Sequence, residues 1–254
     1  MDPLVAQVSA VLLATLRIAP TLAFAPPFTL VRIPALVRLM LGLALAAAIV
    51  AANPAQTWAS GLGGRGLAPA VATELLLGVA LALSLQFAFA ALLTVGRALD
   101  IQVGFGLAAV VDPATRNQMP LIGTVFAYAA GAIFFAGDGP ADLLAIWSAS
   151  VRQVPLGSLA TVDPGPLLGA ISASFLVAAG LGGAVMLALF LTDLVIAFMS
   201  RTLPQMNVML LGFQVKTLVA LALLPAGVAL AGGLFLKLLR GALDAAPYIV
   251  AGAG

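Results

Sequence analysis

Residues 75–96 read LLLGVALALSLQFAFAALLTVG, an uncharged stretch of 22 residues that lies between Glu74 and Arg97. About 20 apolar residues in a helix cross the hydrocarbon core of a bilayer. The stretch lacks the alternation of apolar and polar residues that is typical of a membrane β-barrel strand. It therefore predicts a transmembrane helix.

Five further apolar stretches lie on either side of this segment, at residues 3–31, 39–52, 117–137, 164–192 and 217–236. Together they predict an all-α polytopic membrane protein of about six hydrophobic helical segments. Pro20, Pro26 and Pro27 are expected to break or kink the first of them. The more polar interval 137–166 is expected to be a loop or a short interfacial helix. Without a visible linker, residues 1–254 are expected to form a single membrane-embedded domain.

The composition supports this prediction and excludes most soluble functions. The chain is 63% hydrophobic and 8% charged, whereas a soluble domain is about 45–50% apolar and about 25% charged. Eleven basic and nine acidic residues could not cover the surface of a soluble enzyme or binding domain. A net charge of +2 with no basic cluster gives no sign of nucleic-acid binding.

The sequence also lacks the residues of familiar catalytic sites. It has no Cys and no His, which excludes thiolate or imidazole metal sites and a catalytic base built on His. No HExxH, Gly-x-Ser-x-Gly or P-loop motif is present. The stretch 136–139 superficially resembles an intramembrane aspartyl protease motif, but it lacks the Gly two residues before Gly137. We therefore expect no enzyme activity, no cofactor and no bound metal.

The N-terminus carries no basic residue ahead of the first apolar stretch. We therefore expect this stretch to be retained as a span, because a cleaved secretory signal has a positive start. Basic residues in alternate loops weakly favour an N-terminus outside the cell. That orientation places six of them inside: Arg32, Arg38, Arg97, Arg116, Arg201 and Lys216.

Charged residues at or near the ends of the predicted spans are the first candidates for a functional role. They are Glu74, Arg97, Asp100, Asp193, Arg201 and Lys216. An ionised side chain within the bilayer costs about 2.5–3.5 kcal/mol on insertion scales. These groups could mark span boundaries, form structural or inter-subunit pairs, or relay protons. Arg97 and Asp100 are spaced to share one helical face. Asp193 has apolar neighbours on both sides, and we expect it to pair with a basic residue in this chain or on a partner.

The segment 100–120 is the least regular apolar part of the chain. Gly104, Gly106 and Pro113 disfavour a continuous helix, and Asp112-Pro113 predicts a turn. Irregular backbone at membrane depth is tolerated only where it is buried in protein or lines a water-filled path. The segment is therefore either an ordinary interfacial loop or a constricting loop in a conduit.

Four stretches resemble one known family. They are FAPPFTLVRIPALVRLMLGLALA (24–46), ELLLGVALALSLQFAFAAL (74–92), GRALDIQVGFGLAAVVDPATRNQMPLIG (96–123) and SRTLPQMNVMLLGFQVKTLVALALL (200–224). Their order and spacing resemble the FliR/SctT family of type III export-apparatus proteins. One departure is FFAGDGP (134–140), where Pro140 occupies a position at which the family pattern has His.

The resemblance implies a structural subunit of a protein-export gate in the bacterial inner membrane. Its partners would be FliP-like and FliQ-like subunits, with FlhB-like and FlhA-like proteins nearby. The helices would form stacked hairpins in a helical hetero-oligomer, and unfolded proteins would pass through its central pore. The pore plug of the family corresponds to Gly104, Phe105, Gly106, Leu107, Val110, Val111, Asp112 and Pro113.

Two alternatives to a flagellar export gate stay open from the sequence. The first is the homologous gate of an injectisome, although the residues of the central matching stretch favour a flagellar basal body. The second is a secondary transporter of a small solute. That class uses polar contacts near the bilayer midplane and often an inverted repeat, and this sequence offers few such polar residues and no evident repeat.

Overall fold

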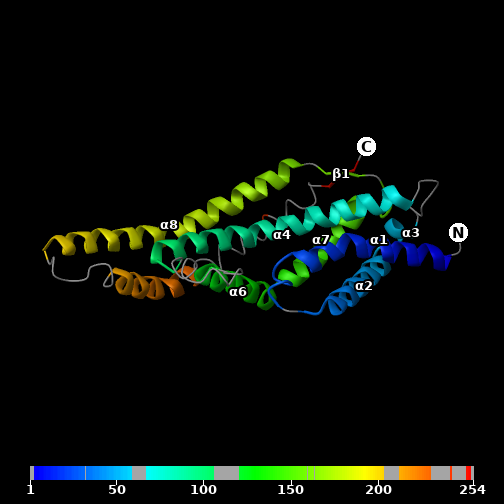
Figure 1. Ribbon diagram of the computed structural model, residues 1–254. Coiled ribbons are helices and arrows are strands. Elements are labelled where there is room, and N and C mark those ends of the chain that lie inside the picture. Colours follow the sequence, from blue (N-terminus) through cyan, green and yellow to red (C-terminus); the bar gives the residue numbers. More distant parts are fainter. Residues whose placement is uncertain are drawn as a thin grey trace. The chain divides into compact units, whose positions relative to one another are not determined.

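A computed structural model describes residues 3–31, 33–58, 67–105, 120–158, 160–162, 164–202, 212–229, 241 and 250–252. The helices are α1 (Pro3–Phe24), α2 (Ala35–Ala52), α3 (Pro54–Trp58), α4 (Leu67–Val103), α6 (Leu121–Ala136), α7 (Gly139–Gln153) and α8 (Pro164–Thr202). One more helix runs over Gly212–Ala229. Two short strands, β1 (Ala160–Val162) and β2 (Val250–Gly252), complete the described elements (Figure 1).

The protein is an all-α polytopic membrane protein. Among the described residues, five helices are long and apolar enough to cross a membrane, namely α1, α2, α4, α8 and Gly212–Ala229. The bent pair of α6 and α7 passes the same criterion when its two helices are counted as one span. The expectation of about six hydrophobic helical segments is therefore confirmed.

The chain folds as two compact units. Unit 1 contains residues 1–88, 134–173 and 237–254, and unit 2 contains residues 89–133 and 174–236. The chain passes from one unit to the other within α4, α6 and α8. That all 254 residues act as a single domain stays a prediction.

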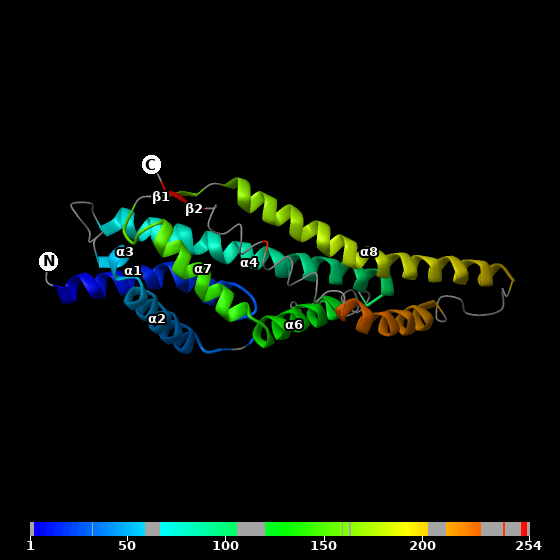
Figure 2. The ribbon, with the colours of Figure 1, turned by 180° about the vertical axis from the view of Figure 1, so that it is seen from behind.

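In unit 1, α1 packs along α2, and the two helices lie together in both views (Figures 1 and 2). Where α1 meets α4, a Cβ at Gly78 would lie 2.9 Å from the carbonyl oxygen of Leu16 and 2.9 Å from Pro20 Cγ. Pro20 has no N–H, so it leaves the Leu16 carbonyl four residues earlier without its helical donor. Gly78 thus permits close packing of α4 at the turn that Pro20 alters.

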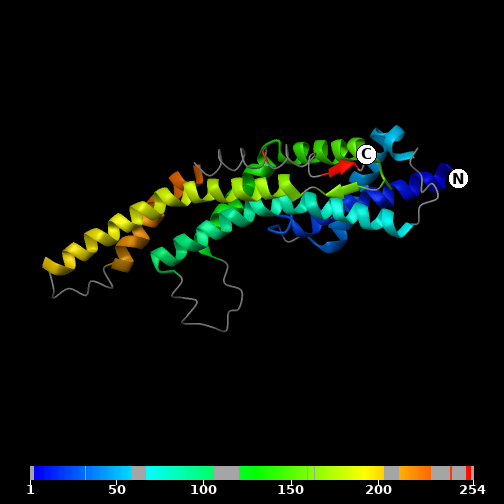
Figure 3. The same cartoon turned by 90° about the horizontal axis from the view of Figure 1, so that it is seen from above.

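Unit 1 also holds the small β-sheet. The strands β1 and β2 pair antiparallel, with Thr161 opposite Ala251 (Figure 3). The pairing connects the segment after α7 to residues close to the C-terminal end of the chain.

In unit 2, small residues allow helices to approach closely. A Cβ at Gly96 of α4 would overlap the backbone of Gly123 in α6, and a Cβ at Gly182 of α8 would overlap the side chain of Val95. Gly227 lies at ordinary contact distance from Phe126 of α6. The core of unit 2 is therefore built by the end of α4, α6, α8 and the helix Gly212–Ala229.

Two helices extend beyond the uncharged stretches that predicted them. The helix α4 continues past Arg97 to Val103, and α8 continues past Asp193 to Thr202. Arginine is a good helix former and a single charge does not stop a helix. What ends α4 is Gly104, whose φ of 102° is the left-handed conformation that glycine provides after a helix.

The prolines of the first apolar stretch act differently from one another. Pro20 lies inside α1 and does not break it, since the helix runs on to Phe24. The helix ends just before Pro26 and Pro27, as expected from the loss of two backbone donors. The first span is therefore shorter than the apolar stretch 3–31 that predicted it.

The interval 137–166 contains a 15-residue helix, α7, which is longer than the loop or short helix expected there. Its buried face carries Leu143, Trp147 and Val151 at spacings of four residues. The helix is amphipathic, and polar residues on its other face make the interval as a whole resemble a loop in composition.

Candidate functional site

The predicted plug loop begins at the end of α4, and the structure describes its first two residues. Gly104 and Phe105 lie within the described part of the chain, whereas Gly106, Leu107, Val110, Val111, Asp112 and Pro113 lie outside it. The Phe105 ring meets Phe213 edge to face, with ring centroids 6.4 Å apart. A Cβ at Gly104 would lie 3.1 Å from the Phe213 ring. We call the two ends of this loop its stems, the first at the end of α4 and the second at the start of α6. The helix Gly212–Ala229 therefore packs directly on the first stem.

Asp100 holds both stems of the same loop. Its backbone carbonyl accepts a hydrogen bond from Gly104 N at 3.1 Å, at the end of α4. Its side-chain Oδ1 accepts a hydrogen bond from Ile122 N at 3.1 Å, in the first turn of α6. A carboxylate in this position satisfies a free N–H group and interacts favourably with the helix dipole. Asp100 is 5% exposed, so water does not weaken this contact.

A polar cluster joins three helices beside the first stem. Lys216 of the helix Gly212–Ala229 forms an ion pair with Asp193 of α8. Gln102 Nε2 of α4 donates to the other Asp193 oxygen at 3.1 Å. Lys216 Nζ also lies 3.5 Å from the carbonyl oxygen of Gln102. The structure thus pairs Asp193 with a basic residue of its own chain, as expected from the sequence.

The two arginines of the predicted set are placed differently. Arg97 and Arg201 are both exposed. Although Arg97 and Asp100 are three residues apart, Asp100 is buried, and the described residues contain no ion pair between them. The structure therefore brings together Asp100, Asp193 and Lys216 around the loop stem, but not Arg97 or Arg201.

Glu74, the remaining charge, is the centre of a separate network in unit 1. Its carboxylate receives two hydrogen bonds from Arg17, from Nε to Oε2 at 2.6 Å and from Nη2 to Oε1 at 3.0 Å. Gly157 N donates to Oε1 at 3.0 Å. The remaining Arg17 nitrogen, Nη1, donates to Ser150 Oγ and to the Val154 carbonyl oxygen, each at 3.0 Å.

This network is fully buried, with side-chain exposures of 1% for Arg17 and 0% for Glu74. It joins α1 and α4 to α7 and to the turn that follows α7. Glu74 was among the residues predicted from the sequence, but its partner was not. The available signal was Arg17 itself, the only charged residue in the apolar stretch 3–31.

The ion pairs and hydrogen bonds of these sites serve to hold helices together. A bidentate pair between a guanidinium and a carboxylate fixes both direction and distance, and the cluster around Asp193 spans three helices. Within the described residues, no group of three His, Cys, Asp or Glu side chains could hold a metal ion.

Comparison with known proteins identifies the family. The family model described as bacterial export proteins, family 1, matches residues 8–242. The chain belongs to this family. The match includes both loop stems, the polar cluster at Asp193 and the buried pair of Arg17 and Glu74.

Several known proteins are similar to the chain over part of its length. The flagellar biosynthetic protein FliR of Escherichia coli is 28% identical over 60% of this chain, and that of Bacillus subtilis is 31% identical over 59%. The Yop proteins translocation protein T of Yersinia pestis is 27% identical over 61%. These alignments span 59%, 60% and 60% of the relatives' own lengths.

Proposed function

We propose that this protein is a structural, pore-forming subunit of the flagellar type III export gate, through which unfolded proteins leave the cell interior. It would assemble with FliP-like and FliQ-like subunits in the bacterial inner membrane, next to FlhB-like and FlhA-like proteins within the basal body. Membership of a bacterial export family and similarity to two FliR proteins support this role.

The observation that carries the proposal is the anchoring of the loop between α4 and α6. One stem is held by the hydrogen bond that Gly104 N donates to the Asp100 carbonyl oxygen and by the contact of Phe105 with Phe213. The other stem is held by the hydrogen bond that Ile122 N donates to Asp100 Oδ1. A segment tethered at both ends can change shape between fixed points without detaching. This suits a plug that must yield to a passing chain and then close again.

In this proposal the plug is the segment Gly104, Phe105, Gly106, Leu107, Val110, Val111, Asp112 and Pro113. Apolar side chains that meet in a narrow pore exclude water and ions by dewetting. The glycines on both sides of Phe105 give the backbone access to conformations that other residues rarely adopt. The plug would therefore keep the resting pore closed to small ions.

The test is the ion conductance of the reconstituted export complex. Replacing Phe105 and Val110 by Ser is expected to raise the resting conductance while the complex stays assembled. Ile101→Ser is the matched control, because Ile101 is an exposed apolar residue one turn before Phe105 and outside the plug. If the double variant assembles and its resting conductance stays as low as that of the wild type, another subunit closes the pore.

A second candidate is the equivalent gate of an injectisome, which the similarity to the Yersinia protein favours. Complementation separates the two. We expect the chain to restore motility to a cell that lacks its own FliR, and not to restore secretion to a cell that lacks its injectisome counterpart. The opposite result would assign it to the injectisome.

A further inference from the structure

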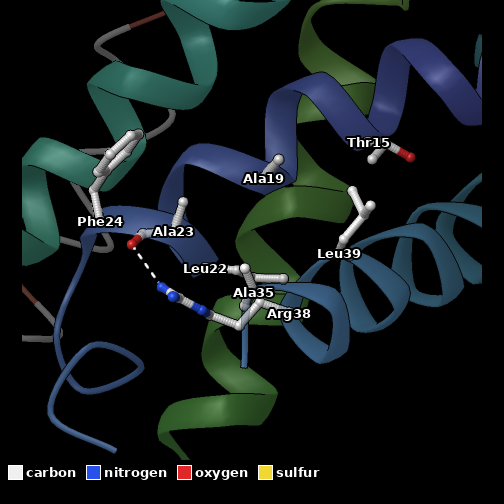
Figure 4. A pocket seen from close by; sticks show the side chains of 9 residues that line it. Thr15, Ala19, Leu22, Ala23, Phe24, Ala35, Arg38 and Leu39 are labelled. Atoms are coloured by element: carbon white, nitrogen blue, oxygen red, sulfur yellow. Dashed lines mark hydrogen bonds between the residues drawn. The ribbon is translucent and has the colours of Figure 1, made fainter. Parts of the chain in front are cut away.

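A cavity of about 340 Å³ lies between α1 and α2 in unit 1 (Figure 4). Its α1 wall runs from Thr15 to Phe24, and its α2 wall runs from Ala35 to Gly42. The α1 residues Thr15, Ala19, Leu22 and Ala23 follow one helical face, so the cavity is elongated along the helix pair. The nine residue steps from Thr15 to Phe24 correspond to about 13 Å of helix. The volume lies within the range of about 300–1,000 Å³ that is usual for small-molecule sites.

The walls of this cavity are apolar except at one end. Thr15 uses its hydroxyl to donate to the Val11 carbonyl oxygen at 2.7 Å. The side chains of Ala19, Leu22 and Leu39 offer no polar group. The remaining polar residue, Arg38, lies in the first turn of α2, close to the end of α1.

Arg38 uses only part of its hydrogen-bonding capacity within the described chain. Its Nη1 donates to the Ala23 carbonyl oxygen at 2.9 Å, which Figure 4 shows as a dashed line. Its Nε is buried and has no acceptor among the described residues. A buried donor without a partner costs free energy. Arginine is also the side chain that grips phosphate in bidentate fashion.

We propose that the cavity binds one anionic phospholipid, with its phosphate on Arg38 and part of one acyl chain between α1 and α2. Both helices are candidate membrane spans by their length and composition, and the surface of a span in a bilayer is in contact with lipid. Arg38 lies in the first turn of α2, and lipid headgroups meet a span at its ends. The elongated apolar walls suit a chain of methylene groups better than a compact or polar ligand. The proposal does not depend on the export role.

The experiment measures lipid bound to the complete protein, purified with its co-expressed partners and returned to nanodiscs or detergent. The probes are phosphatidylglycerol, phosphatidylcholine and inorganic phosphate, and the readouts are native mass spectrometry and thermal stabilisation. We expect phosphatidylglycerol to bind and to stabilise the wild type, with little effect of the other two.

Two variants test the two halves of the site separately. Arg38→Gln removes the cation, and its affinity for phosphatidylglycerol is expected to fall at least about tenfold. Ala19→Leu keeps Arg38 but fills the apolar wall, and it should also lose bound lipid. Arg152→Gln is the matched control, because Arg152 is an exposed arginine of α7 that bonds Ser148.

Each other outcome overturns the proposal in its own way. Equal stabilisation by inorganic phosphate would make Arg38 a simple anion site. Equal binding of phosphatidylcholine would mean that the cavity binds acyl chains without regard to headgroup charge. If Arg38→Gln folds and binds phosphatidylglycerol as well as Arg152→Gln does, the lipid lies elsewhere. If the assembled complex binds no phosphatidylglycerol, the cavity holds no lipid in the assembly.

Discussion

At the scale of single residues, the most costly features are the charges inside helices. Burying an ion pair requires the removal of water from both partners, and the pair is stable only when its geometry and further hydrogen bonds compensate. Arg17 and Glu74 meet this condition, because their contacts reach Ser150, Val154 and Gly157. Asp193 and Lys216 are less buried, with side-chain exposures of 35% and 22%, so their pair depends more on its surroundings.

Glu74→Ala is expected to destabilise the protein strongly, because it leaves Arg17 buried without its anion. Removing one partner of a buried pair costs about 3–5 kcal/mol. The double variant Arg17→Met/Glu74→Met should recover part of that loss, since it leaves no unpaired charge. Thermal unfolding of the purified complex provides the measurement. A double variant that is less stable than Glu74→Ala would contradict the explanation by an unpaired charge.

Asp193→Asn is expected to lower the yield of assembled complex more than it lowers export by each complex that forms. The change removes the ion pair with Lys216 but keeps an acceptor for Gln102. Asp138→Asn, at an exposed acidic residue, is the control. Assembly is measured by co-purification and export by the amount of secreted substrate. Normal assembly with abolished export would instead indicate a proton relay at Asp193.

At the scale of elements, contact between α4 and α6 depends on Gly96 and Gly123. A methyl group at Gly96 would overlap the backbone of Gly123, and a methyl group at Gly123 would lie 3.0 Å from the Leu93 carbonyl oxygen of α4. This contact lies close to both stems of the loop, because Asp100 is one turn from Gly96 and Ile122 precedes Gly123. The distance between α4 and α6 therefore also fixes the distance between the two stems of the loop.

Gly96→Ala should separate α4 from α6 and destabilise unit 2, at a cost of about 1–3 kcal/mol for overpacking. Gly183→Ala on α8 is the control, because no atom lies within 4 Å of a Cβ built there. Without a collision, alanine favours a helix by about 0.5–1 kcal/mol over glycine. The two variants should thus shift the melting temperature in opposite directions. A Gly96→Ala protein as stable as the control would show that α4 and α6 are not held this closely.

The approximate number and position of the spans were the part of the fold that could be predicted well from the sequence, because apolar content over about 20 residues is a local property. Helix ends were predicted less well, since tertiary partners can accommodate a charged residue such as Asp193 inside a helix. The helix α7 was underestimated because polar residues are interspersed among the apolar residues of its buried face. The pair of Arg17 and Glu74 joins positions 57 residues apart, and no local pattern encodes such a contact.

At the scale of the whole molecule, the chain leaves much apolar surface uncovered. Leu187, Phe190, Val195 and Phe198 of α8 are each more than half exposed. Lipid can cover such side chains in a membrane protein, and so can other subunits. Because the proposed gate is a hetero-oligomer, we attribute part of this surface to neighbouring subunits.

The chain expressed alone in detergent is therefore expected to aggregate or to be degraded, and co-expression of export-gate partners should rescue it. Size-exclusion chromatography and the yield of intact protein provide the measurement. Co-expression of an unrelated membrane protein is the control. A lone chain that is monodisperse and thermally robust would count against the export-gate proposal and in favour of a self-sufficient transporter.

The buried pair in unit 1 also has a consequence for the order of events during synthesis. Arg17 is made 57 residues before Glu74, and ribosomes add about 5–20 residues per second. Arg17 therefore remains without the carboxylate of Glu74 for about 3–11 seconds, and without its acceptor Ser150 for longer. During that interval, insertion of an unpaired arginine is opposed by about 2.5–3.5 kcal/mol. Pairing of Arg17 is thus a late event, completed only when the fourth helix arrives.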